Sequence, residues 1–226
     1  MTALRWTLAA SVAAMLTMAA ATCLAQEAAA PALKVGDTWK WREIDLLTKN
    51  EVGRWSERID RVGGGSWWML QDGSKRSWWR GDAAKGARLE QFAVADDQPE
   101  RRGAQVGSAD GGFAWRWPMK VGDSFDCTEN TVFPNGWKLK YELKCSVEAA
   151  ETVEVPAGKF ETLRIVAKGF YTNATQNNAT GRHERSFWYA PAVRNEVKRE
   201  YRTWSPRSAS PIRVEGHELV EFVAGA

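Results

Sequence analysis

The feature that most limits the fold of this chain is an alternation of apolar and charged residues that returns in almost every segment after residue 34. In KLKYELKCSV, residues 138–147, the odd positions are apolar or aromatic, and the even positions carry Lys or Glu up to Ser146. A period of two is typical of a half-buried β-strand, whose side chains point alternately to the core and to solvent.

Residues 195–204 repeat this pattern. One side carries Val197, Tyr201 and Thr203, and the other carries Glu196, Lys198, Glu200 and Arg202. A row of charges that alternate in sign is typical of a solvated sheet face, because charged groups rarely leave water. We therefore expect the charged side of this segment to face solvent rather than to form a binding site.

Similar patterns predict further strands at 38–44, 56–62, 66–71, 75–80, 87–94, 112–117, 123–128, 160–170, 182–189 and 211–223. A convincing helical stripe is missing after the first 25 residues, although residues 93–102 have room for a turn or two. The chain is thus expected to form an all-β, antiparallel domain with short turns.

The first 25 residues have the composition of a secretory signal peptide. Arg5 precedes an apolar run rich in Ala, Leu and Met, and small residues end the run at Ala25. We expect cleavage before Gln26, which leaves residues 26–226 as a single β domain in the periplasm. A lipid anchor on Cys23, secretion or an uncleaved membrane anchor is less favoured, because Thr22 is a poor neighbour for a lipidated cysteine and the apolar run is too short to span a membrane.

Charge and cysteine content exclude several classes of function. Without the leader the chain keeps 30 basic and 28 acidic residues with no basic block, so nothing selects nucleic acid. Cys127 and Cys145 remain as an even pair in an oxidising compartment, which favours a disulfide. His183 and His217 stand too far apart in sequence to complete a metal site with them, and no cofactor motif is present.

Dipeptides that favour turns separate the predicted strands. Asp72-Gly73 and Asn135-Gly136 tolerate the positive φ of two-residue hairpin turns, and Pro191 should end the strand before it. A two-residue turn at Asn135-Gly136 brings the two cysteines within one residue of direct opposition, so a bulge or a longer loop must shift the register. The echo between KVGDTW, 34–39, and KVGDSF, 120–125, indicates a reused turn or a duplicated half-domain; we favour the reused turn, because the sequences that follow differ.

The stretch VEVPAGKFETLRI, residues 153–165, is a candidate phosphate-binding loop because of its Pro and Gly. It lacks the further glycines, the Lys-Ser/Thr pair and the helix that such a loop requires. Pro156 fits the second position of a β-turn and Gly158 the fourth, so the stretch predicts a hairpin corner with Phe160 in the core.

The same corner, with FWYAPAVRNEVKRE at 187–200 and FAWRWPMKVGDSF at 113–125, resembles a widespread family of bacterial periplasmic proteins of unknown function. Its members share a V-P-A-G-x-F-(D/E)-T-L-R corner, a W-Y-A-P strand end and a P-L-x-V-G-D turn. They are similar in fold to the lipoprotein-carrier-like open β-barrels. The resemblance implies a single curved antiparallel sheet or open half-barrel of about 10–12 strands able to hold something apolar, and it implies no catalytic residue.

Tryptophan is unusually frequent, with 13 in the whole chain and four in SWWMLQDGSKRSWWRG, residues 66–81. A two-residue turn at Asp72-Gly73 would place Trp67 opposite Trp78 on one face, and Trp68 diagonal to Trp79 on the other. One pair would then fill the core, while the other would be exposed or line a cavity. The functional interpretation is a ligand-binding surface made by Trp67, Trp68, Trp78 and Trp79; the alternative is a hairpin stabilised by aromatic pairs.

Enzymatic chemistry is not indicated. A G-x-S-x-G elbow is absent, and neither histidine has a partner motif that would make it a base. The first functional hypothesis is a non-enzymatic periplasmic protein that binds an apolar or lipid-like ligand in a curved sheet. The alternatives are a carbohydrate- or peptidoglycan-binding module that uses a Trp platform, and a structural accessory subunit of an envelope complex with an unknown protein partner.

Overall fold

The computed structural model describes residues 27–74, 76–85, 87–94, 102–110 and 115–226. The expected signal peptide therefore lies outside the described residues, as do most of the turn expected at 93–102 and part of the strand expected at 112–117. None of the helices described is long and apolar enough to cross a membrane.

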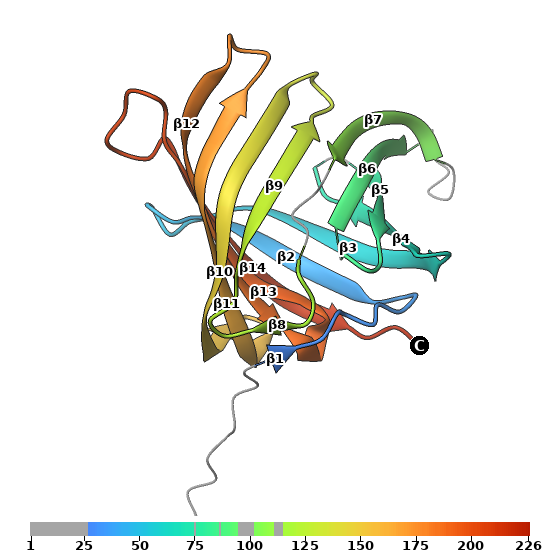
Figure 1. The fold of residues 1–226 in the computed structure, drawn as a ribbon. Coiled ribbons are helices and arrows are strands. Elements are labelled where there is room, and N and C mark those ends of the chain that lie inside the picture. The colour runs from blue at the N-terminus through green and yellow to red at the C-terminus, as the bar shows by residue number, and fades with distance from the viewer. Residues whose placement is uncertain (1–26, 75, 86, 95–101, 111–114) are drawn as a thin grey trace, which may run out of the picture.

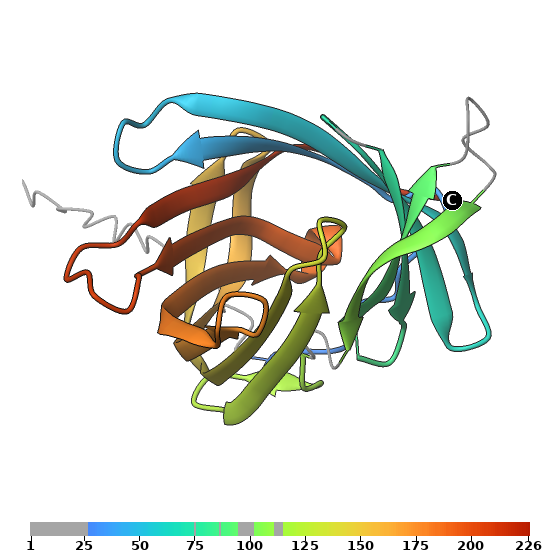
Figure 2. The same cartoon turned by 90° about the horizontal axis from the view of Figure 1, so that it is seen from above.

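The structure is one antiparallel sheet that curves round and closes into a barrel (Figures 1 and 2). In the order of their pairing the strands are β10 (Lys138–Val155), β11 (Gly158–Asn173), β12 (Ala179–Ala190), β13 (Asn195–Thr203), β14 (Arg213–Val223), β2 (Thr38–Asp45), β3 (Glu51–Gly63), β4 (Ser66–Asp72), β5 (Ser77–Asp82), β6 (Ala87–Val94), β7 (Arg102–Asp110) and β9 (Ser124–Val132). The predicted all-β class and curved antiparallel sheet are confirmed.

The barrel closes through a short seam rather than staying open as a half-barrel. Strand β9 pairs with β10 over nine residues, from Ser124 to Val132, but it pairs with β7 only at Ser108–Asp110. Strand β7 was not predicted, because RGAQVGSAD has two glycines and no clear alternation. Of the strand expected at 112–117, the described residues 115–117 are not in a strand.

A second, two-stranded sheet packs against the lower end of the barrel in Figure 1. It consists of β1 (Glu27–Ala28) and β8 (Met119–Lys120). Ala28 and Met119 are buried in a core cluster with inward-facing side chains of β10, β11 and β12, among them Val147 and Ile165. This small sheet therefore contributes apolar side chains to the core at that end.

The corner at residues 153–165 is a hairpin turn, as predicted. Val155 pairs with Gly158, which leaves Pro156 and Ala157 as the two turn residues. Gly158 has φ of 130°, a conformation that side chains with a Cβ rarely adopt. Phe160 is partly buried against the largest core cluster.

Pro191 ends β12, as its missing N–H predicts. It begins a short 3₁₀ turn, η1 (Pro191–Val193), and Arg194 follows in the left-handed region with φ of 57°. The Val193 carbonyl accepts a hydrogen bond of 2.8 Å from Trp39 Nε1, so the turn is tied to β2.

The two KVGD sequences form the same turn. In both, the aspartate N–H donates to the lysine carbonyl at 3.0 Å, and the aspartate carboxylate accepts from the lysine N–H at 2.8 Å. Gly36 and Gly122 have φ of 90° and 96°. Each turn also bonds a neighbouring strand next to a β-bulge, at Ile59 in β3 and at Val147 in β10. The same short sequence thus occurs at two places in the chain, and at each it forms a tight turn and hydrogen-bonds a strand beside a β-bulge.

The disulfide between Cys127 and Cys145 is confirmed, but the predicted register around it is wrong. Cys127 stands opposite Leu143 and Cys145 opposite Phe125, so the bridge runs diagonally between β9 and β10 with 6.0 Å between the Cα atoms. The loop at Asn135-Gly136 is longer than two residues, which is one of the two expected alternatives, and the Phe133 N–H donates to the Trp137 carbonyl; this loop does not bring the two cysteines opposite each other. Both cysteines remain on the inner face, which is what the bridge requires.

Candidate functional site

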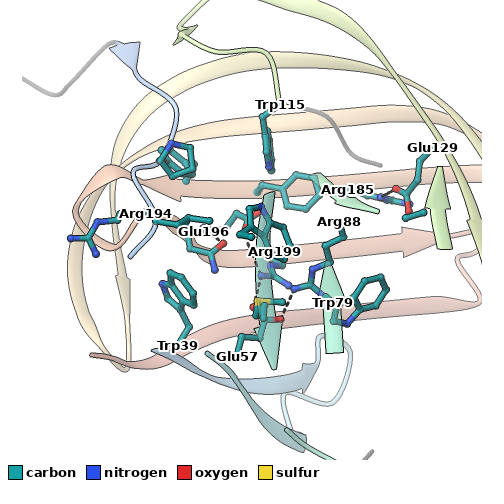
Figure 3. Close-up of a pocket in the computed structure, with 18 of the residues that line it drawn as sticks. Trp39, Glu57, Trp79, Arg88, Trp115, Glu129, Arg185, Arg194, Glu196 and Arg199 are labelled. Atoms are coloured by element: carbon teal, nitrogen blue, oxygen red, sulfur yellow. Dashed lines mark hydrogen bonds and ion pairs between the residues drawn. The ribbon is translucent and has the colours of Figure 1, made fainter. Parts of the chain in front are cut away.

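The barrel contains an open cavity of about 410 Å³, lined by side chains from most of the strands and from the segment before β8 (Figure 3). This volume lies within the range of small-molecule sites, roughly 300–1,000 Å³. The lining is of two kinds, aromatic side chains and ion pairs. Many of these side chains come from inward-facing strand positions, whereas Trp115, Trp117 and Arg194 come from segments between strands.

Tryptophans supply much of the aromatic wall. Trp39, Trp67 and Trp79 project from β2, β4 and β5. Trp115 and Trp117 come from the segment before β8 and lie edge-on against two inward-facing rings of β12, with centroids 5.2 Å from Phe187 and 5.0 Å from Tyr189. In Figure 3 Trp115 points into the group of lining residues. Edge-to-face contacts of this kind hold the rings in fixed positions around the cavity.

Glu57 is the central carboxylate of the polar lining and is almost fully buried. Its Oε1 accepts from Arg88 Nη2 at 2.6 Å and from Trp55 Nε1 at 3.2 Å, and its Oε2 lies 3.8 Å from Arg199 Nη2. Figure 3 shows Arg88 and Arg199 converging on it. Burial alone would raise the pKa of Glu57, but these two guanidinium groups lower it to about 2, so the carboxylate is ionised at neutral pH.

A second ion pair joins β9 to β12. Arg185 Nη1 donates to Glu129 at 2.8 Å, and Arg185 Nε donates to His183 Nε2 at 2.8 Å. The guanidinium lies 4.2 Å from the ring centre of Tyr141, which stacks the cation on an aromatic face. Burial and then the charge of Arg185 lower the pKa of His183 to about 3, so this imidazole is neutral and accepts the hydrogen bond.

Glu196 corrects a prediction made from the alternation. The pattern places it on the solvated side of β13, but its side chain is buried, lines the cavity and pairs with Arg199 at 3.3 Å. The reason is a β-bulge between β12 and β13: Trp188 stands opposite Lys198 but Tyr189 stands opposite Glu196, so Glu196 shares the inner face with Tyr189. The other three charged residues of that row, Lys198, Glu200 and Arg202, are not among the cavity residues.

The register of the tryptophan hairpin also differs from the prediction. Gln71 stands opposite Ser77, so the connection covers residues 72–76 instead of a two-residue Asp72-Gly73 turn. Trp67 therefore lies opposite Gly81, and Trp79 opposite Met69. Trp67 and Trp79 share the inner face and line the cavity, while Trp68 and Trp78 share the outer face. The pairs expected on each face are thus wrong, and a role in ligand binding stays a prediction for all four.

Gly81 makes room for the Trp67 ring, and its replacement gives a direct test of this packing. A Cβ at residue 81 would stand 1.9 Å from Trp67 Cζ2. We expect Gly81→Ala to lower the free energy of unfolding by about 1–3 kcal/mol, because the indole must leave its position in the core. Gly63→Ala is the matched control, since a Cβ at that strand position meets nothing within 4 Å. Urea unfolding curves compare the two variants, and equal stability would contradict the packing described here.

The inward arginines were missed by the sequence reasoning, although a signal for them exists. Arg199 lies on the same alternate positions as Val197 and Tyr201, and Arg185 on those of Phe187. A charge in the apolar row of a strand predicts either a break in the pattern or a buried polar group. This signal identifies neither the carboxylates that pair with the arginines nor the cavity, because Glu57 and Glu129 belong to strands that are distant in the sequence.

Catalytic or metal-binding arrangements are not apparent in the part of the chain that the structure describes. There, no group of three or more His, Cys, Asp or Glu side chains could hold a metal ion. His217 is, like His183, held neutral: burial and then the charge of Arg199 lower its pKa to about 3.

Comparison with known proteins identifies the fold and no more. The chain matches no protein-family model and no curated protein. Among solved structures it is similar to a "putative lipoprotein" from Parabacteroides distasonis, with a TM-score of 0.55, 12% identity, and coverage of 87% of this chain and 99% of the other. It is also similar to a "putative exported protein" with a YmcC-like fold from Bacteroides fragilis, with a TM-score of 0.52, 14% identity and the same coverage. At these identities the likeness shows a shared barrel fold.

Proposed function

We propose that this protein is an exported, non-enzymatic binding protein that holds an apolar or lipid-like ligand inside its barrel. The observation that carries the proposal is the internal cavity of about 410 Å³ with its wall of tryptophans. Ligand sites are concave, mostly apolar and supplied with a few placed polar groups, and this cavity has each of these properties. The names of the two similar structures, which refer to a lipoprotein and an exported protein, support an extracytoplasmic location.

Purification from its own envelope tests the proposal without a guess about the ligand. Native mass spectrometry of the protein, followed by lipid extraction, should reveal a bound amphiphile that is absent from protein refolded out of denaturant. The intact mass in the same experiment reports whether the chain begins at Gln26 or carries acyl chains on Cys23. Envelope protein that releases no apolar molecule would count against the proposed function.

Tryptophan replacement locates the binding site. We expect Trp79→Ala to abolish the change in fluorescence on adding an extracted ligand, because Trp79 lines the cavity. Trp68→Ala is the matched control, since Trp68 lies in the adjacent strand on the outer face. Fluorescence titration and the free energy of unfolding are measured for both. Loss of the response in both variants, or in neither, would place the ligand elsewhere.

The carbohydrate alternative receives less support from the geometry. A Trp platform for a sugar ring needs flat, solvent-facing rings. On the outer face Trp78 is only 3% exposed, and the ring of Trp68 is inclined by 42° to that of Phe92.

A further inference from the structure

Charges that line the cavity are paired one to one. Among the described residues the lining contains four arginines, and each has a carboxylate partner. The pairs are Arg88 with Glu57, Arg185 with Glu129, Arg199 with Glu196, and Arg194 with the buried Asp37, at 2.6, 2.8, 3.3 and 2.6 Å. The described lining includes no lysine and no histidine. The lining itself holds four arginines and three glutamates, and the charges sum to zero when Asp37, which pairs with Arg194 but does not line the cavity, is counted with them.

A neutral wall selects against an ionic ligand. A carboxylate or ammonium placed beside these pairs would bring one uncompensated charge next to side chains that are largely removed from water, since those of the Arg185–Glu129 and Arg199–Glu196 pairs are only 10–15% exposed. Such a charge costs several kcal/mol unless it is paired. The arginines and carboxylates of the wall are already paired with each other. Neither an anionic nor a cationic ligand would therefore meet an unpaired counter-ion among the described residues.

The cavity wall, by contrast, offers a ligand more hydrogen-bond donors than acceptors. A guanidinium has five N–H groups, and Arg88 uses one of them, at Nη2, in the hydrogen bonds of the described part. In the Arg88–Glu57 and Arg194–Asp37 pairs the guanidinium side chains are 31% and 21% exposed, whereas the carboxylates are 1% and 0% exposed, so the N–H groups reach the accessible surface and the carboxylate oxygens do not. A ligand with oxygen acceptors would form hydrogen bonds with these donors.

We propose that the ligand joins its apolar part to an uncharged polar group rich in hydrogen-bond acceptors, as in an acyl ester of a polyol or sugar. The inference rests on the proposed function and specifies its ligand class. The ester carbonyl and hydroxyl oxygens lie against the arginine N–H groups, and the acyl chain lies against the tryptophan wall. The ligand adds acceptors to the site without adding charge.

Three probes with twelve-carbon chains test the charge of the ligand. Monolauroylglycerol is neutral, laurate is an anion and dodecyltrimethylammonium is a cation at neutral pH. Each is titrated into delipidated protein below its critical micelle concentration, with tryptophan fluorescence and calorimetry as readouts. We expect monolauroylglycerol to bind at least about tenfold more tightly than either ion, a difference of about 1.4 kcal/mol. Equal or tighter binding of an ion would overturn the inference.

Variants that change the charge of the wall should change which probe binds best. Loss of stability alone would not change this order. Glu129→Gln gives the wall a charge of +1 and should shift the preference toward laurate by about tenfold. Arg185→Gln gives it a charge of −1 and should shift the preference toward dodecyltrimethylammonium. Glu196→Gln serves in place of Glu129→Gln if that variant does not fold. Glu154→Gln, at a surface side chain that is 72% exposed, is the control and should change nothing.

The outcomes separate the two proposals. If one of the ions binds best, or if the variants leave the order of the probes unchanged, the inference fails while the barrel remains a lipid-binding site. If none of the three probes binds, and protein from the envelope carries no amphiphile, the proposed function fails and the inference falls with it.

Discussion

Replacement of Glu57 by alanine is expected to lower the free energy of unfolding by about 3–5 kcal/mol. The carboxylate is almost fully buried between Arg88 and Arg199, so its removal leaves two guanidinium groups in the barrel with reduced compensation. Chemical unfolding followed by tryptophan fluorescence measures the effect. Glu154→Ala, which removes an exposed carboxylate paired with Lys159 on the surface, should change the stability by no more than about 1 kcal/mol.

A double variant shows whether the loss arises from unpaired charge. Replacing Glu57 by Leu and Arg88 by Met together removes both members of the 2.6 Å pair. The double variant should be more stable than Glu57→Ala, because buried ion pairs can be exchanged for apolar side chains at little cost, whereas a lone buried charge cannot. A double variant less stable than the single one would argue that packing, rather than charge, dominates at this site.

Acidification should unfold the protein through its two histidines. The pKa values of His183 and His217 are lowered from 6.5 to about 3 in the folded state. Between these values the unfolded chain binds a proton at each imidazole and the folded chain does not, so stability is complete above pH 6.5 and falls as the pH drops toward 3. Each histidine contributes about 1.4 kcal/mol per pH unit, which predicts a combined slope of about 2.7 kcal/mol per unit near pH 5.

The cause is the surroundings of each imidazole. Burial acts first on both; His183 then faces Arg185 and Arg213. His217 faces Arg199, Arg213 and Arg88, and Glu57 opposes their effect. Protonation of His183 would also place an N–H against the Nε–H of Arg185, where a lone pair now accepts the hydrogen bond.

Urea unfolding at a series of pH values from 5 to 7 measures the slope. His183→Gln should reduce it by about half, because one of the two proton-binding groups is gone. The buried carboxylate of Glu57 contributes little above pH 5, since its pKa is lowered to about 2. Stability that does not change over this range would show that the imidazoles reach water in the folded state.

Two properties of the barrel connect its stability with its proposed function. The ion pairs that should make the fold sensitive to replacement of Glu57 are the same groups that give the cavity its neutral polar wall. The tryptophans that line the cavity also belong to the core, as Trp39 and Trp67 do. A ligand inside the barrel would therefore contact residues that fold the protein, which is why the binding test pairs Trp79 with a control on the outer face.

The sequence by itself determined the class and the local geometry. The period of two predicted the antiparallel strands, the Pro156–Gly158 spacing predicted the hairpin corner, and Pro191 predicted the end of β12. The even pair of cysteines predicted the disulfide. The disulfide joins residues 18 positions apart and was predictable because a single pair of cysteines remains. The other features depend on side chains within a few residues of one another, or on a backbone conformation that one residue imposes, so the chain carries them locally.

Only the tertiary structure decided register, closure and the cavity. One longer connection after Gln71 moved Trp67 opposite Gly81, and a β-bulge between β12 and β13 turned Glu196 inward. Closure through Ser108–Asp110 joins strands whose curvature accumulates around the whole sheet. The pairing of Glu57 with Arg88 and of Glu129 with Arg185 joins residues 31 and 56 positions apart. Such contacts depend on the sum of many turns, bulges and twists, and no local pattern encodes that sum.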